Sequence, residues 1–252
     1  MYKDAPHEGF TWPKYARSII IAALLAILIQ QVTGLDPSRA AGIVVLWGLV
    51  YACERLLLEL WKGYIREEDQ SKYFIPMQFG VMGKPVKDRR VRWSVLLALL
   101  TILLLVVIGV RALQRSYPDL PPWLVLVTIG SLGGWITAFG GAWKDAPVEG
   151  FETFKFFRSP AISLFWAVIV SFFTQDWILI SIAGAGYSVA TIETYKTFFF
   201  PSKPRGKFAG KPITHPLILQ WRYRFVPLYV AIWIGVIASY MLAFSESRDG
   251  LI

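Results

Sequence analysis

Long apolar runs alternate with polar segments along the whole chain. The runs cover residues 18–34, 40–61, 93–113, 123–143, 159–174, 177–199 and 226–245. A helix of about 20 residues crosses a hydrocarbon core of about 30 Å. The pattern therefore predicts an all-α integral membrane protein with seven transmembrane helices, a multi-pass protein of the cytoplasmic or plasma membrane.

The composition agrees with a membrane protein and excludes an ordinary soluble domain. Of the 252 residues, 55% are hydrophobic and 15% aromatic, and the mean hydropathy is +0.49. The first apolar run has a basic flank like that of a secretory signal, but the same pattern recurs at 144–174, so we interpret the run as a retained helix. The single cysteine, Cys53, excludes an intrachain disulfide.

Basic residues are distributed unevenly between the two predicted sides of the membrane. Of the 26 Lys and Arg residues, 21 fall on the side of the N-terminus, in segments 1–17, 62–92, 143–158 and 196–225. Positively charged loops are retained in the cytoplasm. We therefore predict a cytoplasmic N-terminus and a C-terminus on the outer side.

One polar octet occurs twice, as KDAPHEGF at 3–10 (the first octet) and KDAPVEGF at 144–151 (the second octet). Residues 2–18 and 143–159 are identical at ten of seventeen aligned positions, and a Gly-Lys-Pro sequence follows in each half, at 83–85 and 210–212. We interpret this as a duplication into a first repeat (1–113), a linker helix (121–143) and a second repeat (144–245). Three helices plus one return the chain to its starting side, so the 3+1+3 repeats are parallel, with a pseudo-twofold axis along the membrane normal.

Glycines indicate two further features. Gly9 and Gly150, near the end of each octet, predict a bend between a short interfacial helix and the following membrane helix. In the linker helix, small residues recur at intervals of four at Gly130, Gly134, Ala138 and Ala142. Such a ridge predicts close packing against a neighbouring helix.

Carboxylates of the octets and of the second helix in each repeat are the candidate ligand-binding or ion-binding groups. They are Asp4, Glu8, Glu54, Glu59, Asp145, Glu149 and Glu193. Oxygen-rich clusters suit divalent cations, and Asp145, Glu149 and Glu193 are the candidate metal ligands. The alternative is that each acid caps a helix or pairs with a nearby base, as Glu193 could with Lys196. No cofactor is predicted beyond this divalent cation, because paired cysteines and histidine metal patterns are absent from the sequence.

Glu54 is the most deeply placed of these acids. It lies within the second apolar run, where a carboxylate needs a partner or an aqueous cavity. Arg55 follows directly, but it points about 100° away around a helix, which makes it an imperfect partner. Whether Glu54 or Glu59 corresponds to Glu193 in the second repeat is left open.

Basic side chains near the same boundaries are candidate sites for lipid headgroups and other anions. They are Lys14, Arg17, Lys62, Lys84, Lys155, Arg158, Lys196 and Lys211. The Gly-Lys-Pro sequences lack the spacing of a phosphate-binding loop. Cytoplasmic retention of positive charge already accounts for the basic loops, so we expect membrane lipids and anionic headgroups as partners and no nucleic acid.

The sequence favours a small transporter or channel whose cytoplasmic-side site is built from the two octets. Its 3+1+3 plan resembles, in architecture alone, that of sugar facilitators of the SWEET type. One alternative is an enzyme that acts on lipid or polyprenyl phosphates at the inner leaflet through a metal-binding carboxylate cluster. Another is an accessory subunit of a larger membrane complex, and a homo-oligomer is a further arrangement. The absence of a catalytic dyad weighs against an enzyme.

Overall fold

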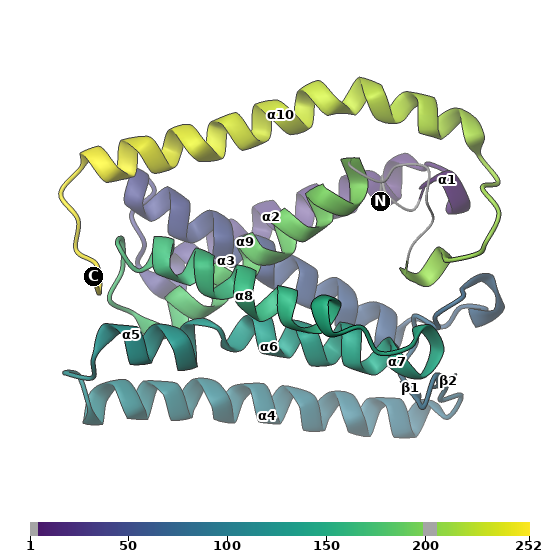
Figure 1. Cartoon of the computed structure of the whole chain (residues 1–252), viewed down its shortest axis with the longest axis horizontal. Coiled ribbons are helices and arrows are strands. Elements are labelled where there is room, and N and C mark those ends of the chain that lie inside the picture. The colour runs from purple at the N-terminus through teal and green to yellow at the C-terminus, as the bar shows by residue number, and fades with distance from the viewer. Residues whose placement is uncertain (1–4, 199–205) are drawn as a thin grey trace.

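The computed structural model describes residues 5–198 and 206–252, and within them the chain is almost entirely helical (Figure 1). The longer helices are α2 (Trp12–Thr33), α3 (Ala40–Leu60), α4 (Arg89–Ser116), α8 (Thr153–Val170), α9 (Trp177–Phe198) and α10 (Pro216–Ser245). The shorter ones are α1 (Ala5–Glu8), α5 (Pro122–Val125), α6 (Leu132–Ala138) and α7 (Lys144–Glu149). Two-residue strands, β1 (Gly80–Val81) and β2 (Lys84–Pro85), form an antiparallel hairpin.

Seven helical segments in the described residues are long and apolar enough to cross a membrane, which confirms the predicted class of protein. They are Trp12–Thr33, Ala40–Ile65, Arg89–Ser116, Pro122–Glu149, Thr153–Val170, Trp177–Phe198 and Pro216–Ser245. Two of them include π-helical turns: α3 continues through one at Trp61–Ile65, and the segment from α5 to α7 contains two, at Leu126–Gly130 and Phe139–Trp143. The linker helix has one turn residue, Ser131, and continues from α6 into the second octet.

The connecting segments gather at two opposite ends of the molecule (Figure 1). One end, here called the octet end, carries α1, the β1–β2 hairpin, α7 and residues 206–215. The other, here called the strap end, carries residues 34–39, 117–121, 171–176 and 246–252. Each octet bends where predicted, because Gly9 and Gly150 adopt positive φ angles of 75° and 83°.

Helices α3 and α9 form the centre of the bundle, with α10 along one edge of the view and α4 along the opposite edge (Figure 1). The contact between α3 and α9 is the most extensive between any two of the described helices, and it depends on glycines, which have no side chain. A Cβ atom on Gly186 would lie 1.9 Å from the carbonyl oxygen of Gly48, and one on Gly48 would lie 2.8 Å from the carbonyl oxygen of Ala183. The two backbones therefore touch directly, as small residues allow in membrane helices.

The small residues of the linker helix pack against α8, as predicted. A Cβ atom on Gly134 would lie 2.5 Å from the Cα atom of Pro160, and one on Gly130 would lie 3.0 Å from the Cβ atom of Ala167. Ala138 is fully buried on the same ridge. Close approach, rather than a glycine-lined opening, is what this ridge provides.

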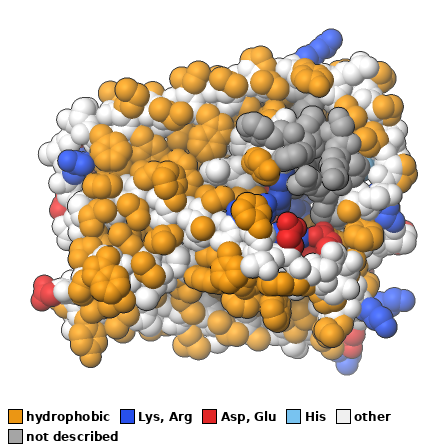
Figure 2. Space-filling view, in the orientation of Figure 1, with side chains coloured by type: hydrophobic (Ala, Val, Ile, Leu, Met, Phe, Trp, Pro, Cys, Tyr) orange, Lys and Arg blue, Asp and Glu red, His pale blue; other side chains and the backbone are white. Residues whose placement is uncertain are grey.

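The surface between the two ends is hydrophobic. Side chains exposed along α2 and α4 include large aliphatic residues over most of each helix length. Figure 2 shows hydrophobic side chains over most of one face, with the charged side chains lying mainly toward the octet end and at the opposite edge. Such a belt is the surface that lipid tails cover in a membrane protein.

Candidate functional site

The first octet joins a cluster of polar residues drawn from three segments. Glu8 Oε1 accepts hydrogen bonds from Lys207 Nζ at 3.2 Å and from the Tyr73 hydroxyl at 3.3 Å. The same hydroxyl lies closer to Glu68 Oε2, at 3.0 Å, and its single proton can be donated to only one of the two carboxylates at a time. Arg66 supplies positive charge, with its Nη2 atom 2.6 Å from Glu68. We call Glu8, Arg66, Glu68, Tyr73 and Lys207 the first octet cluster.

The electrostatics of the first octet cluster favour the protonated form of Tyr73 and the ionised form of Glu68. Partial burial, the charge of Glu8 and the hydrogen bond to Glu68 raise the pKa of Tyr73 far above its usual value. Partial burial also acts to raise the pKa of Glu68, but the hydrogen bond from Tyr73 and the positive charges of Arg66, Lys72 and Lys14 outweigh it, so this pKa is lowered. The cluster is therefore held together by a neutral phenol between two anions.

Backbone contacts dock the first octet onto the segment that contains the second Gly-Lys-Pro sequence. The His215 amide donates to the Pro6 carbonyl at 2.9 Å, and His7 Nδ1 donates to the Pro212 carbonyl at 2.9 Å. The Thr214 hydroxyl donates to the His7 carbonyl at 2.8 Å. The His7 ring also stacks on Phe208, with ring centroids 4.3 Å apart. The first octet thus contacts the second half of the chain.

The second octet has its own ion pairs and contacts the first half of the chain. Asp145 lies 3.3 Å from Lys144, and Glu149 pairs with Lys155 of α8. Val148 packs against the β1–β2 turn, where a Cβ atom on Gly83 would lie 2.6 Å from its Cγ2 atom. Gly83 belongs to the first Gly-Lys-Pro sequence, so each octet contacts the Gly-Lys-Pro segment of the other half.

A second charged group lies at the contact between α3 and α9. Glu54 is only 5% exposed, and its Oε2 atom is 3.3 Å from Arg55 Nε. Arg55 therefore does pair with Glu54, contrary to the expectation from helix geometry. Arg55 also interacts electrostatically with Glu193 of α9. Within the described part of the chain, Glu54 Oε1 accepts no hydrogen bond although it is buried.

Aromatic rings form a compact cluster beside this charged group, in which Trp233 lies 6.3 Å from Trp47. Arg55 lies over the Tyr51 ring, 5.4 Å from its centroid. The rings of Tyr51, Trp47, Tyr187, Trp166 and Trp233 then stack one on another, with successive centroids 4.7 to 6.4 Å apart. We call these five rings the aromatic stack.

Hydroxyl groups of α9 and a carbonyl of α3 satisfy the polar atoms of the aromatic stack. The indole nitrogens of Trp166 and Trp233 donate to Thr191 and Thr194 at 3.0 and 3.1 Å. The Tyr187 hydroxyl donates to the Val44 carbonyl at 2.7 Å. The stack thus joins side chains of α3, α8, α9 and α10 around Tyr187, which is fully buried, whereas the other four rings are partly buried.

The predicted carboxylates do not gather into one site. Glu59 pairs with Lys62 at 2.9 Å on the surface of α3, and Glu193 lies 3.6 Å from Lys196. Glu54 and Glu193 are brought together around Arg55, whereas Glu8 and Glu59 have separate partners. Asp4 lies outside the described residues. In the described ranges, no three His, Cys, Asp or Glu side chains are placed to share a metal ion.

The predicted basic residues have several surroundings at the octet end. Lys211 Nζ donates to the Ser71 carbonyl at 3.0 Å, which ties the segment with the second Gly-Lys-Pro sequence to the polar segment that follows α3. Lys14, Arg17 and Lys84 are exposed, and Arg158 of α8 is half-buried. The exposed side chains are the ones in a position to reach lipid headgroups.

Sequence reasoning missed the aromatic stack and most of the first octet cluster. Trp47 and Tyr51 are four residues apart on one helix, a spacing that places two rings on one face. Their partners on other helices carry no comparable signal. Arg92, one of the basic residues of segment 62–92, carries no such signal either, but it is 2% exposed and donates to the carbonyls of Tyr64, Val86 and Lys87.

The chain matches no protein-family model, no curated protein and no solved structure.

Proposed function

We propose that this multi-pass membrane protein is a small transporter and that its central site is the buried group of Glu54, Arg55 and Glu193. The observation that carries the proposal is Glu54, a carboxylate within a membrane-spanning helix, 5% exposed and with one oxygen lacking a hydrogen bond within the described residues. An ionisable group at such depth is costly and is typical of solute or ion pathways. The aromatic stack lies beside this site, where Arg55 contacts the Tyr51 ring.

Two exchanged contacts at the octet end support a parallel duplication of the chain. The first octet contacts Pro212 in the second half, and the second octet contacts Gly83 in the first half. Because the same sequence element meets the same partner element in both cases, a pseudo-twofold axis between the halves accounts for the pattern. The two octets then close one end of the proposed pathway, the end we assign to the cytoplasm from the distribution of basic residues.

At the strap end, an acid lies at the start of the second helix of each half. In the second half, Asp176 accepts hydrogen bonds from the first amides of α9 and pairs with Arg111 of α4 at 2.6 Å. In the first half, the Ala40 amide at the start of α3 donates to Glu246, directly after α10. In both halves an acid thus binds amide groups at the start of the second helix, where the helix dipole favours an anion, but Asp176 belongs to the same half as its helix and Glu246 does not.

Sidedness of the two octets tests the duplication. Epitope tags inserted after Phe10 and after Phe151 are read out in sealed vesicles with an antibody that cannot cross the membrane. The parallel arrangement predicts that both tags react from the cytoplasmic side. Tags that react from opposite sides would refute the parallel arrangement of the two repeats and the pathway inferred from it.

Reconstituted flux tests transport. Proteoliposomes are assayed for uptake of labelled glucose, choline, lysine and inorganic phosphate, which sample neutral, cationic and anionic solutes. We expect uptake of at least one probe above that of empty liposomes and a loss of at least tenfold in Glu54→Gln, because the substitution removes the buried charge while keeping the shape.

Glu59→Gln is the matched control for this assay. Glu59 is on the same helix, but it is exposed and paired with Lys62. Its substitution should leave the uptake within twofold of the unmodified protein. Equal uptake by Glu54→Gln and the unmodified protein would exclude Glu54 as the centre of the site.

A further inference from the structure

Residues 246–252, here called the strap, cross the strap end of the bundle after α10. The strap is fastened first at the start of α3. Glu246 Oε1 accepts a hydrogen bond from the Ala40 amide at 3.2 Å, and Arg39 donates to the Ser247 carbonyl at 2.8 Å. These contacts hold the beginning of the strap beside the central helix of the bundle.

The far side of the strap is fastened to the turn after α8. The Leu251 amide donates to the Ser171 carbonyl at 2.7 Å. Gly250 lies directly against the same turn, where a Cβ atom would come within 2.4 Å of the Phe172 backbone. The Leu251 side chain packs on the hydrophobic cluster that contains Tyr240 and Ala243. The strap thus covers the end of the same core in which the aromatic stack lies.

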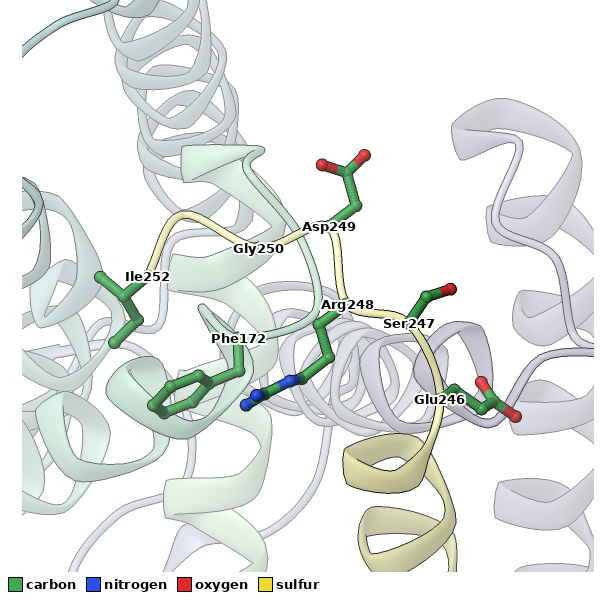
Figure 3. Close-up of a pocket in the computed structure, with 7 residues that line it drawn as sticks. All are labelled: Phe172, Glu246, Ser247, Arg248, Asp249, Gly250 and Ile252. Atoms are coloured by element: carbon green, nitrogen blue, oxygen red, sulfur yellow. The ribbon is translucent and has the colours of Figure 1, made fainter.

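Between these two attachments the strap does not pack tightly. A cavity of about 490 Å³ lies beside it, lined by Phe172 and by residues of the strap itself (Figure 3). The Arg248 guanidinium lies 5.6 Å from the centroid of the Phe172 ring, and Gln175 donates to Asp249 at 2.6 Å. Both are contacts of exposed polar side chains, which water can replace at small net cost.

We propose that the strap is the outer gate of the transport pathway. It is held by a few hydrogen bonds and one partly buried leucine, its residues line an open surface pocket, and it packs on the cluster of Tyr240 and Ala243. Release of Gly250 and Leu251 from the turn after α8 opens the aromatic stack to the outer side. This inference rests on the proposed transport function and adds the element that regulates access from outside.

Gly250→Ala is the direct perturbation, because the added methyl group cannot fit against Phe172. The reporter is Ala243→Cys, fully buried on α10, in a Cys53→Ala background that leaves no other thiol. Right-side-out vesicles are treated with the impermeant thiol reagent 2-(trimethylammonium)ethyl methanethiosulfonate, and the labelling rate of Cys is measured by mass shift. Gly250→Ala should raise this rate at least tenfold.

Gly235→Ala is the matched control, since the same substitution on α10 meets no atom within 4 Å. It should leave the labelling rate within twofold of the reporter protein alone. Deletion of residues 248–252 is a second way to release the strap and should match or exceed the effect of Gly250→Ala. Gel filtration and thermal unfolding verify that each variant is folded.

The outcomes separate the gate from the transport function. An unchanged labelling rate in both strap variants, with Glu54-dependent uptake intact, overturns the gate and leaves transport standing. A raised rate in a protein that takes up none of the four labelled probes overturns transport, and the gate with it, and leaves the strap as a static cover. A raised rate together with faster uptake from outside supports the gate.

Discussion

The contact between α3 and α9 makes a quantitative prediction for Gly186→Ala. The new Cβ atom would lie 1.9 Å from the carbonyl oxygen of Gly48. A non-bonded carbon and oxygen approach to about 3.3 Å, so the two backbones must separate by about 1.4 Å along this line. Neither atom is the end of a flexible side chain, and the strain must be taken up by the helices themselves.

The expected cost follows from two opposing terms. Overpacking of a tight core costs about 1–3 kcal/mol, and contact of backbone with backbone belongs at the upper end of that range. Replacing Gly by Ala in a helix interior stabilises the helix by about 1 kcal/mol through its higher helix propensity. We therefore expect Gly186→Ala to lower the free energy of unfolding by about 2 kcal/mol. A chain of this size would then unfold about 4–8 °C lower.

Thermal unfolding in detergent, followed by circular dichroism, measures this shift. Gly235→Ala serves as the control, because nothing lies within 4 Å of its new methyl group. It should be as stable as the unmodified protein or gain up to about 1 kcal/mol from helix propensity. If Gly186→Ala unfolds at the same temperature as Gly235→Ala, the direct contact of α3 with α9 is refuted.

Three further predictions concern polar groups. Arg92→Lys should lower the free energy of unfolding by about 2–3 kcal/mol, measured by thermal unfolding, because one ammonium cannot reach all the carbonyls that the guanidinium binds. Arg89→Lys is the control and should leave the stability unchanged, because Arg89 is exposed. The pKa of Glu68 is lower in the folded protein than the ordinary value of 4.5, so ionised Glu68 stabilises the fold above pH 4.5 and this stabilisation is lost as the pH falls through the folded pKa. Glu68→Gln should therefore flatten the dependence of the unfolding temperature on pH between about 5 and 3. Tyr187→Phe should cost about 1 kcal/mol by leaving the Val44 carbonyl without its buried donor, and an unchanged unfolding temperature would contradict that bond.

Features that depend on local pattern were predictable from the sequence. Seven apolar segments, the bends at Gly9 and Gly150, and the small-residue ridge through Gly134 follow from length, positive φ and residue size. Each of these properties is read over at most about twenty neighbouring residues. Long-range pairing was not readable in this way, because Glu8 and Lys207 are 199 residues apart and only the fold brings them together.

The strap and the aromatic stack were missed for different physical reasons. The segment 246–252 is short and mostly polar, and it has no hydrophobic periodicity that would predict a packed element. The aromatic residues lie within apolar runs, where any helix face is compatible with lipid, so their stacking depends on how the helices cross. Arg55 shows the remaining limit: the angle between neighbouring helix positions suggested a poor partner for Glu54, but the long side chain reaches it at 3.3 Å.

Two-sided access to the aromatic stack tests the central claim most directly. Thr191 lies on α9 and accepts the hydrogen bond from Trp166. In the Cys53→Ala background, Thr191→Cys is exposed to an impermeant thiol reagent in right-side-out and in inverted vesicles. A transporter that opens alternately to each side predicts labelling in both preparations. Labelling from one side only, or from neither, would contradict a pathway between α3 and α9.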